Sequence, residues 1–192
     1  MKKIKISIFI ILSLNALTSF VAMPTEYLSI KSFVFEKETY TLNWSVKDKN
    51  HYKQEYIRSN DTLINFNKMI IVDVLLTDID LKSFVSSKMQ EIEKKKSSDP
   101  VANYQIIENE KTGEFLLDFL LSDGDLYEWN AYRYKKINTN KGNGILLFAY
   151  SFRSFEKAEL KLDNFFPYLK KNRMDLINTV ANYKLPSVAI KD

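Results

Sequence analysis

The first half of the chain contains a stretch in which apolar and polar residues alternate strictly. Within Tyr40–Val46, the side chains of Tyr40, Leu42, Trp44 and Val46 fall at every second position. A period of two is typical of a strand with one buried face and one face in solvent. We therefore expect a strand here, with these four side chains on a single face.

A second strand is expected directly after the first. Residues 47–50 are polar and predict a turn, so that Tyr52–Ile57 completes a hairpin and presents Tyr52, Gln54 and Tyr56 on one face. A tyrosine-rich face has two common uses. It can be a binding surface, or it can pack against aromatic side chains of neighbouring strands, which is the more frequent arrangement.

The middle of the chain changes from strand to helix. An earlier strand is expected within Leu28–Phe35, and the nearly continuous apolar run Lys68–Leu76 predicts a central strand covered on both faces. Apolar residues then recur at helical spacing, at Leu81, Phe84, Val85, Met89 and Ile92. Asp78 or Asp80 can cap the start of this helix, which we expect to lie on the sheet.

Four more strands and a second helix follow. Short polar connections separate four alternating runs, as expected for an antiparallel meander: Tyr104–Glu108, Glu114–Leu121, Leu126–Ile137 and Ile145–Arg153. The last helix has one apolar stripe, formed by Phe166, Leu169, Leu176, Ile177 and Val180. Asp163 or Asn164 can cap it, which places Pro167 in its first turn, where proline is tolerated.

The order of these elements predicts an α+β protein. We expect an antiparallel sheet of about six strands, with a helix after the third or fourth strand, a long C-terminal helix, and both helices packed on the sheet faces. No repeat or linker interrupts residues 23–192, which are expected to form a single domain.

The N-terminus has the pattern of a secretory signal peptide. A basic start, Met1–Lys5, precedes about ten apolar residues, too few to span a membrane stably. Cleavage is expected after Ala22, although Phe20 suits the third position before the cut poorly. The alternative is an uncleaved N-terminal anchor. We expect a bacterial protein exported to the periplasm or, alternatively, to the extracellular medium, with no stable membrane span after cleavage.

Removal of residues 1–22 changes the charge of the chain. It takes away three lysines and no acid, so that Lys and Arg fall from 28 to 25 against 24 Asp and Glu, and the net charge falls from +4 to +1. The two basic runs, Glu93–Lys96 and Lys170–Arg173, fall at a helix end or on an exposed helix face. Nucleic acid is therefore not an expected partner.

Few residues suit catalysis or metal binding. The chain has one histidine, His51, and no cysteine, and we expect His51 to be an exposed residue of a turn. Nothing here supports a catalytic triad or a zinc site. The segment Asp123–Asp125 is superficially similar to a calcium loop, but a tight hairpin turn explains it more simply. We expect no catalytic residue, no metal and no cofactor.

Asp118 is the single acid expected inside a buried strand, and a buried carboxylate needs a partner. If residues 123–124 form a two-residue turn, Asp118 faces Trp129. A matching register in the next hairpin then sets Trp129 opposite Arg153, and the three residues form one row. The row is either a structural ion pair, which is favoured, or a cleft with Trp129 as its floor. A slip by one residue would set Asp118 opposite Asn130.

Three stretches resemble the PsbP-like fold. They are Tyr40–Val46 with its embedded tryptophan, Glu55–Ile57 with the polar loop that leads into Asn65–Ile70, and Gly144–Arg153 before the last helix. The similarity covers roughly residues 38–185 as a pattern, without a signature motif. The resemblance implies a binding or accessory protein rather than an enzyme, and no site residue follows from it.

We therefore expect a non-enzymatic accessory or binding protein of the cell envelope, whose partner is an envelope protein or a small ligand. The candidate binding residues are Asp118, Trp129, Arg153, Tyr52 and Tyr56. Two alternatives stay open, a hydrolase with acids and tyrosines around Asp118, and an immunity or inhibitor protein. A pocket lined by at least two acids with shifted pKa values would favour the hydrolase, whereas a shallow exposed aromatic patch would favour the binding protein.

Overall fold

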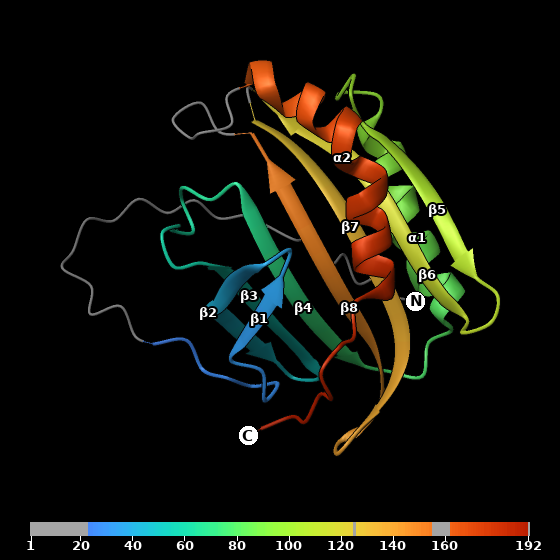
Figure 1. Ribbon diagram of the computed structural model, residues 1–192. Coiled ribbons are helices and arrows are strands. Elements are labelled where there is room, and N and C mark those ends of the chain that lie inside the picture. Colours follow the sequence, from blue (N-terminus) through green and yellow to red (C-terminus); the bar gives the residue numbers. More distant parts are fainter. Residues whose placement is uncertain (1–22, 125, 155–161, 192) are drawn as a thin grey trace.

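A computed structural model describes residues 23–124, 126–154 and 162–191, with the side chains of residues 162 and 163 excluded. Eight strands form one antiparallel sheet in the order β1-β2-β3-β4-β8-β7-β6-β5, accompanied by two helices (Figure 1). The elements are β1 Ser32–Phe35, β2 Glu38–Asp48, β3 His51–Arg58, β4 Lys68–Leu76, α1 Leu81–Lys95, β5 Asn103–Asn109, β6 Glu114–Asp123, β7 Leu126–Thr139, β8 Gly142–Arg153 and α2 Leu162–Asn182. The predicted signal peptide falls on residues 1–22, which lie outside the described residues.

The predicted fold class was wrong in the number of strands in the sheet and in how much of the sheet the two helices cover. The sheet has eight strands rather than about six, and each helix covers only part of it: α1 lies mainly against β5, β6 and β7, and α2 mainly against β7 and β8. The pairing of β4 with β8, from Lys68↔Phe152 to Leu76↔Gly144, joins the N-terminal strands to the meander. Hydrophobic periodicity reveals strands but not which distant strands pair, so the number of strands in the sheet was underestimated.

Several local predictions are confirmed. The central strand spans Lys68–Leu76 as expected. The hairpin of β2 and β3 forms, and the last four strands make an antiparallel meander. Of the two predicted caps of α1, Asp80 is the one used, since its carboxylate accepts a hydrogen bond of 2.9 Å from the backbone nitrogen of Ser83. This bond satisfies one of the donors that a helix start leaves open.

Trp44 lies on the opposite face from the one predicted. The register of β2 against β3 shifts between Leu42 and Trp44, because Asn43 forms a bulge. An extra residue in one strand reverses the alternation beyond it. Tyr40 therefore points into the core, whereas Trp44 pairs with Glu55 on the other face and keeps 37% of its surface exposed.

The two faces of the sheet bury different sets of side chains. One face carries the larger core, where side chains of β1, β3, β4, β7 and β8 pack against α2 and the segments before β1 and after α2. The other face packs against α1 at β6 and β7, and against Phe66 from the loop between β3 and β4. Burial of both faces supplies the hydrophobic stabilisation of the chain, which has no cysteine for a disulfide.

Helix α2 differs from the predicted apolar stripe at its first position and in where the helix begins. Phe165, not Phe166, is fully buried; Phe166 is 39% exposed. The helix already includes residue 162, so Asp163 and Asn164 lie within it rather than capping it, and Pro167 falls in its second turn. Leu169, Leu176, Ile177 and Val180 face the core as expected.

The segments at the two ends of the described chain lie side by side. The backbone nitrogen of Lys191 donates to the carbonyl of Tyr27 at 2.8 Å, and the Ser29 hydroxyl donates to the carbonyl of Ala189 at 2.8 Å. Next to this contact, the ring of Tyr183 stacks on Phe148 with centroids 5.0 Å apart and planes 7° apart. The two end segments thus cover the large core together.

Candidate functional site

Asp118 lies in the middle of β6, but its cross-strand neighbour is not the predicted one. Strand β6 runs to Asp123, which pairs with Leu126 of β7. This shifts the register by two positions from the prediction. Asp118 consequently pairs with Ala131, and neither Trp129 nor Asn130 lies directly opposite it.

The predicted row of Asp118, Trp129 and Arg153 does not exist. In the next hairpin Trp129 pairs with Phe152, and Arg153 pairs with Glu128. This register is one position away from the prediction. Since side chains alternate along a strand, a shift by one moves Arg153 to the opposite face of the sheet from Trp129.

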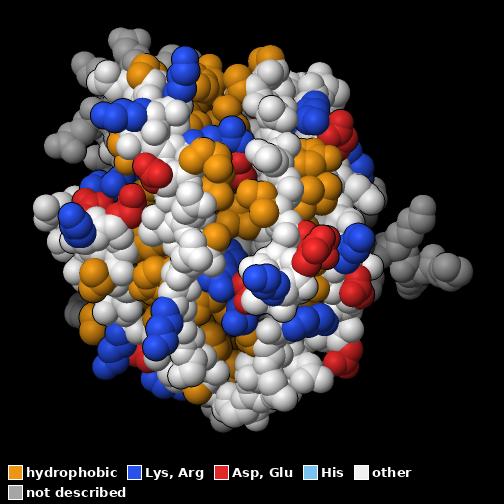
Figure 2. All heavy atoms as spheres, turned by 45° about the vertical axis from the view of Figure 1, so that its right-hand side comes forward, with side chains coloured by type: hydrophobic (Ala, Val, Ile, Leu, Met, Phe, Trp, Pro, Cys, Tyr) orange, Lys and Arg blue, Asp and Glu red, His pale blue; other side chains and the backbone are white. Residues whose placement is uncertain are grey.

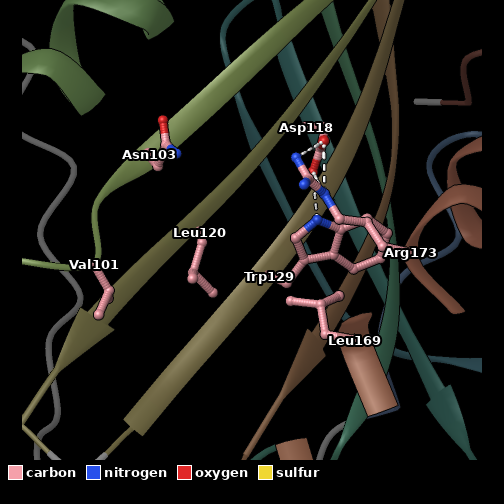
Figure 3. A pocket seen from close by; sticks show the side chains of 7 residues that line it. All are labelled: Val101, Asn103, Asp118, Leu120, Trp129, Leu169 and Arg173. Carbon is pink, nitrogen blue, oxygen red and sulfur yellow. Dashed lines mark hydrogen bonds and ion pairs between the residues drawn. The ribbon is translucent and has the colours of Figure 1, made fainter. Parts of the chain in front are cut away.

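Asp118 and Trp129 nevertheless meet, because a shift by two preserves the face. Trp129 pairs with Leu120, two residues from Asp118 on the same face, so the contact is diagonal. The indole Nε1 of Trp129 donates a hydrogen bond to Oδ1 of Asp118. The cation is Arg173 of α2: its Nε donates to Oδ2 at 3.0 Å and to Oδ1 at 3.2 Å, and its Nη2 also donates to Oδ2 (Figure 3).

This arrangement satisfies the buried carboxylate completely. Asp118 has no exposed surface, whereas the side chain of Arg173 is 41% exposed. An ionised carboxylate without partners would be costly at such a depth. A two-pronged arginine contact and an indole donor fix the orientation of both oxygens. Asp118 therefore fixes the position of the guanidinium from below, and Arg173 is the charged residue of this group that solvent can reach.

A cavity of about 230 Å³ opens beside this group, between α2 and the start of β5. It is lined by Val101, Asn103, Asp118, Leu120, Trp129, Leu169 and Arg173. Figure 2 views the side of the molecule that carries α2 and β5, and shows hydrophobic side chains gathered in its middle with acidic and basic groups around them. No described residue accepts a hydrogen bond from Nη1 of Arg173, so this donor is available to a bound molecule.

Arg153 has a different environment from the predicted one. Its guanidinium carbon lies 3.4 Å from the ring centroid of Phe66, and its Nε donates to the backbone carbonyl of Phe66 at 2.9 Å. It thereby holds the loop between β3 and β4 against the sheet. Burial raises the pKa of its neighbour Glu128, although Asn130 and Arg153 oppose this shift. Arg153 and Asp118 belong to opposite faces of the molecule.

The two candidate tyrosines of β3 are not surface residues. Tyr52 is 3% exposed and Tyr56 has no exposed surface. The hydroxyl of Tyr56 donates to the carbonyl of Ile30 at 3.0 Å, and the side chain of Gln54 accepts from the backbone nitrogen of Leu28 at 2.7 Å. This face of β3 holds the N-terminal segment in place, so Tyr52 and Tyr56 serve packing rather than an open binding surface.

The described residues contain no group of three or more acids, histidines or cysteines that could hold a metal ion. In the segment that is similar to a calcium loop, Asp123 is the last residue of β6 and pairs with Leu126 of β7.

His51 is not an exposed turn residue. It begins β3, and its Nε2 lies 2.7 Å from Oδ1 of Asp73 on β4. This hydrogen bond raises the pKa of His51 above its ordinary value of 6.5, and the charge of Asp73 adds to the shift. A raised pKa in the folded state means that the interaction stabilises the fold most fully below pH 6.5 and is lost as the pH rises through the shifted pKa.

We expect the substitution His51→Gln to cost stability at low pH and little at high pH. Because the His51 side chain is 39% exposed, the difference should be at most about 1 kcal/mol. Urea unfolding of both proteins between about pH 6 and pH 9 measures it. The substitution Asp73→Asn should remove the same pH dependence, and a difference that stays constant over this range would contradict the assignment.

The sequence did carry a signal for Arg173. It lies four residues after Leu169 and three before Leu176, on the apolar stripe of α2. A lone cation on a core-facing stripe needs an anion, and Asp118 was a lone anion in an apolar strand. The prediction missed this match because it treated Lys170–Arg173 as one exposed basic run.

The fold and the site together define a protein with one large antiparallel sheet, two helices, and a small cavity whose polar floor is an Asp–Arg–Trp group. A protein-family model, described only as a family, matches residues 28–185, and the chain belongs to that family. No curated protein and no solved structure matches the chain. Within the described residues, neither helix is long and apolar enough to cross a membrane.

Proposed function

We propose that the protein is an exported, non-enzymatic binding protein of the cell envelope, and that the cavity beside Asp118, Trp129 and Arg173 is its binding site. The observation that carries this proposal is a fixed arginine at the rim of an apolar cavity. Asp118 holds the guanidinium in place without blocking Nη1. Binding sites commonly combine apolar walls with a few oriented polar groups.

The lining indicates the class of ligand. Val101, Leu120 and Leu169 provide apolar surface, and Nη1 of Arg173 offers hydrogen-bond donors at the rim. Asp118 already neutralises the guanidinium, so the site favours an oxygen acceptor of either charge state rather than a strong anion alone. A short apolar chain that ends in a carbonyl or carboxylate fits this chemistry.

The hydrolase alternative receives less support from the same residues. Glycoside hydrolysis, for example, needs a pair of carboxyl groups on either side of the reacting bond. Among the described residues that line the cavity, Asp118 is the one acid, and both of its oxygens already accept hydrogen bonds. No specific observation favours an immunity or inhibitor protein. Similarity of three stretches to the PsbP-like fold supports an accessory role by analogy.

Tryptophan fluorescence can test the site directly. The chain has two tryptophans, Trp44 and Trp129, so the substitution Trp44→Phe leaves an emission signal from the cavity floor. We expect hexanoate and hexanamide to change the emission of Trp129 with a Kd on the order of 1 mM. Hexylamine, which offers no oxygen acceptor and carries a positive charge, should not bind.

Two further variants in the Trp44→Phe background give the control. Val101→Phe fills the cavity from its wall and should abolish the response to hexanoate. Val34→Phe adds the same bulk on β1, where Val34 is 65% exposed, and should leave the response intact. Equal changes in Trp129 emission with hexanoate and hexylamine, or a change with hexanoate that persists in Val101→Phe, would contradict the proposal.

The proposed location of the protein is inferred from residues 1–22 alone. Cell fractionation of a host that expresses the full chain should recover a shortened product in the periplasm, and deletion of residues 2–22 should leave the product in the cytoplasm. Recovery of the full-length product in the membrane fraction would instead support an uncleaved anchor.

A further inference from the structure

Strand β5 forms an edge of the sheet that is open to pairing. It pairs with β6 on one side, and no described strand pairs with its other side. Most of its residues are exposed, including Ile107 at 38%. The outer backbone N–H and C=O groups of such a strand are available to another strand, which makes an open edge a site of strand addition.

The usual protections of an edge strand are absent from β5. Its sequence, Asn-Tyr-Gln-Ile-Ile-Glu-Asn, contains no lysine, proline or glycine. Its register against β6 is continuous over all seven residues, without a bulge. The opposite edge differs: β1 has four residues, and the hydroxyl of Tyr183 donates to the carbonyl of Val34 at 3.1 Å. One edge is short and partly covered, whereas the other is longer and regularly paired along its length.

We propose that β5 pairs with β5 of a second copy of this chain, in an antiparallel register centred on Ile106, to form a symmetric dimer with a continuous sheet. This proposal is independent of the proposed ligand. A two-fold axis perpendicular to the sheet relates the two copies, so residues that pair point to the same face. Ile106 then faces Ile106 of the other copy, and all seven residues of β5 find a partner.

The register brings complementary groups together. Tyr104 faces Glu108 of the other copy, and Asn103 faces Asn109. The ammonium of Lys96, at the end of α1, lies 4.9 Å from the ring centroid of Tyr104. Directly opposed side chains have Cβ atoms about 5 Å apart. The carboxylate of Glu108 from the second copy therefore reaches Lys96, and symmetry produces this ion pair twice.

The charge pattern selects a second copy over an unrelated strand. Glu108 is exposed and takes part in no ion pair with another described residue, while Lys96 pairs with Glu93 of its own helix at 2.8 Å. A partner strand must offer an acid opposite Tyr104 and tolerate isoleucine at its centre. The sequence of β5 itself meets both conditions in one register.

Cysteine cross-linking tests the pairing, because the natural chain has no cysteine. In the proposed register the two Ile106 Cα atoms lie about 5 Å apart, within the range of a disulfide. The variant Ile106→Cys, at about 100 µM protein, should form a disulfide-linked dimer under mild oxidation. Val34→Cys, on the opposite edge and more exposed, should cross-link at least tenfold more slowly.

Charge exchange provides a second measurement that does not depend on the packing of Ile106. Sedimentation analysis should show that Glu108→Lys weakens the dimer at least tenfold, because it sets two lysines together. The double variant Lys96→Glu/Glu108→Lys should restore it. The control Glu110→Lys makes the same charge change in the turn after β5 and should have little effect.

The results of these experiments either support the proposed dimer or overturn it. A concentration-dependent dimer that Glu108→Lys weakens and the double variant restores supports the proposal. A chain that is monomeric at about 100 µM, or that dimerises with no response to Glu108→Lys, overturns it. Cross-linking of Ile106→Cys no faster than that of Val34→Cys also overturns it.

Discussion

We expect the substitution Arg173→Ala to lower the free energy of unfolding by about 3 kcal/mol. The reason is that it leaves the carboxylate of Asp118, which has no exposed surface, with the indole of Trp129 as its one remaining side-chain partner. Removing one member of a buried ion pair typically costs about 3–5 kcal/mol. Because the side chain of Arg173 is 41% exposed, water can enter the space that it leaves, so the lower end applies. Urea unfolding measures the loss.

A second substitution tests whether the isolated charge causes this loss. Asp118→Asn in the Arg173→Ala background removes the charge but keeps an oxygen that can accept from Trp129, so the double variant should be more stable than Arg173→Ala alone. Lys170→Ala removes an exposed cation from the same helix and should change the free energy of unfolding by less than about 0.5 kcal/mol. A double variant as unstable as Arg173→Ala would show that lost packing, not charge, is responsible.

The substitution Phe148→Ala should be at least as damaging, with a loss of about 4 kcal/mol. Phe148 lies in the central strand β8 and has no exposed surface. Its ring centroid lies 5.7 Å from that of Phe33 and 5.0 Å from that of Tyr183. It therefore joins the sheet, the N-terminal strand and the segment after α2, and its removal leaves a cavity that none of them can fill alone.

Two comparisons make this prediction specific. Phe166→Ala removes the same ring from a position that is 39% exposed, and should cost no more than about 1–2 kcal/mol. Phe148→Ala and Tyr183→Ala together should cost less than the sum of the single losses, because the two rings stack on each other. Strict additivity of the two losses would mean that the end segment is held by other contacts.

The sequence predicted local structure well and long-range structure poorly, for a physical reason. Lys68–Leu76 was predicted with its correct bounds because its apolar run and polar flanks are local. The face of Trp44 was wrong because a single bulge at Asn43 reverses the alternation, and nothing local distinguishes that residue. The pairing of β4 with β8 leaves no periodic trace at all, and it makes one sheet of eight strands.

The candidate site shows the same division. Asp118 and Trp129 were expected to meet, and they do, although through a diagonal rather than a direct contact. Arg153 was placed wrongly because an error of one position in a hairpin register moves a side chain to the other face. Arg173 comes from a helix whose distance from β6 in the sequence hides the contact. A search for single charged residues among the apolar positions of predicted strands and helices would have paired Arg173 with Asp118.

The contact between the two end segments has a consequence for how the chain acquires its structure. The Ser29 hydroxyl bonds a carbonyl 160 residues further along the chain, and Tyr183 closes over Phe148. The large core therefore stays open until residues 183–191 have emerged from the ribosome. For a polypeptide that is threaded through a membrane with its N-terminus leading, as proposed, this delay is useful. On the proposed export route, the chain cannot reach its final packing while residues 183–191 are still on the inner side, so it should stay in a form that can be threaded.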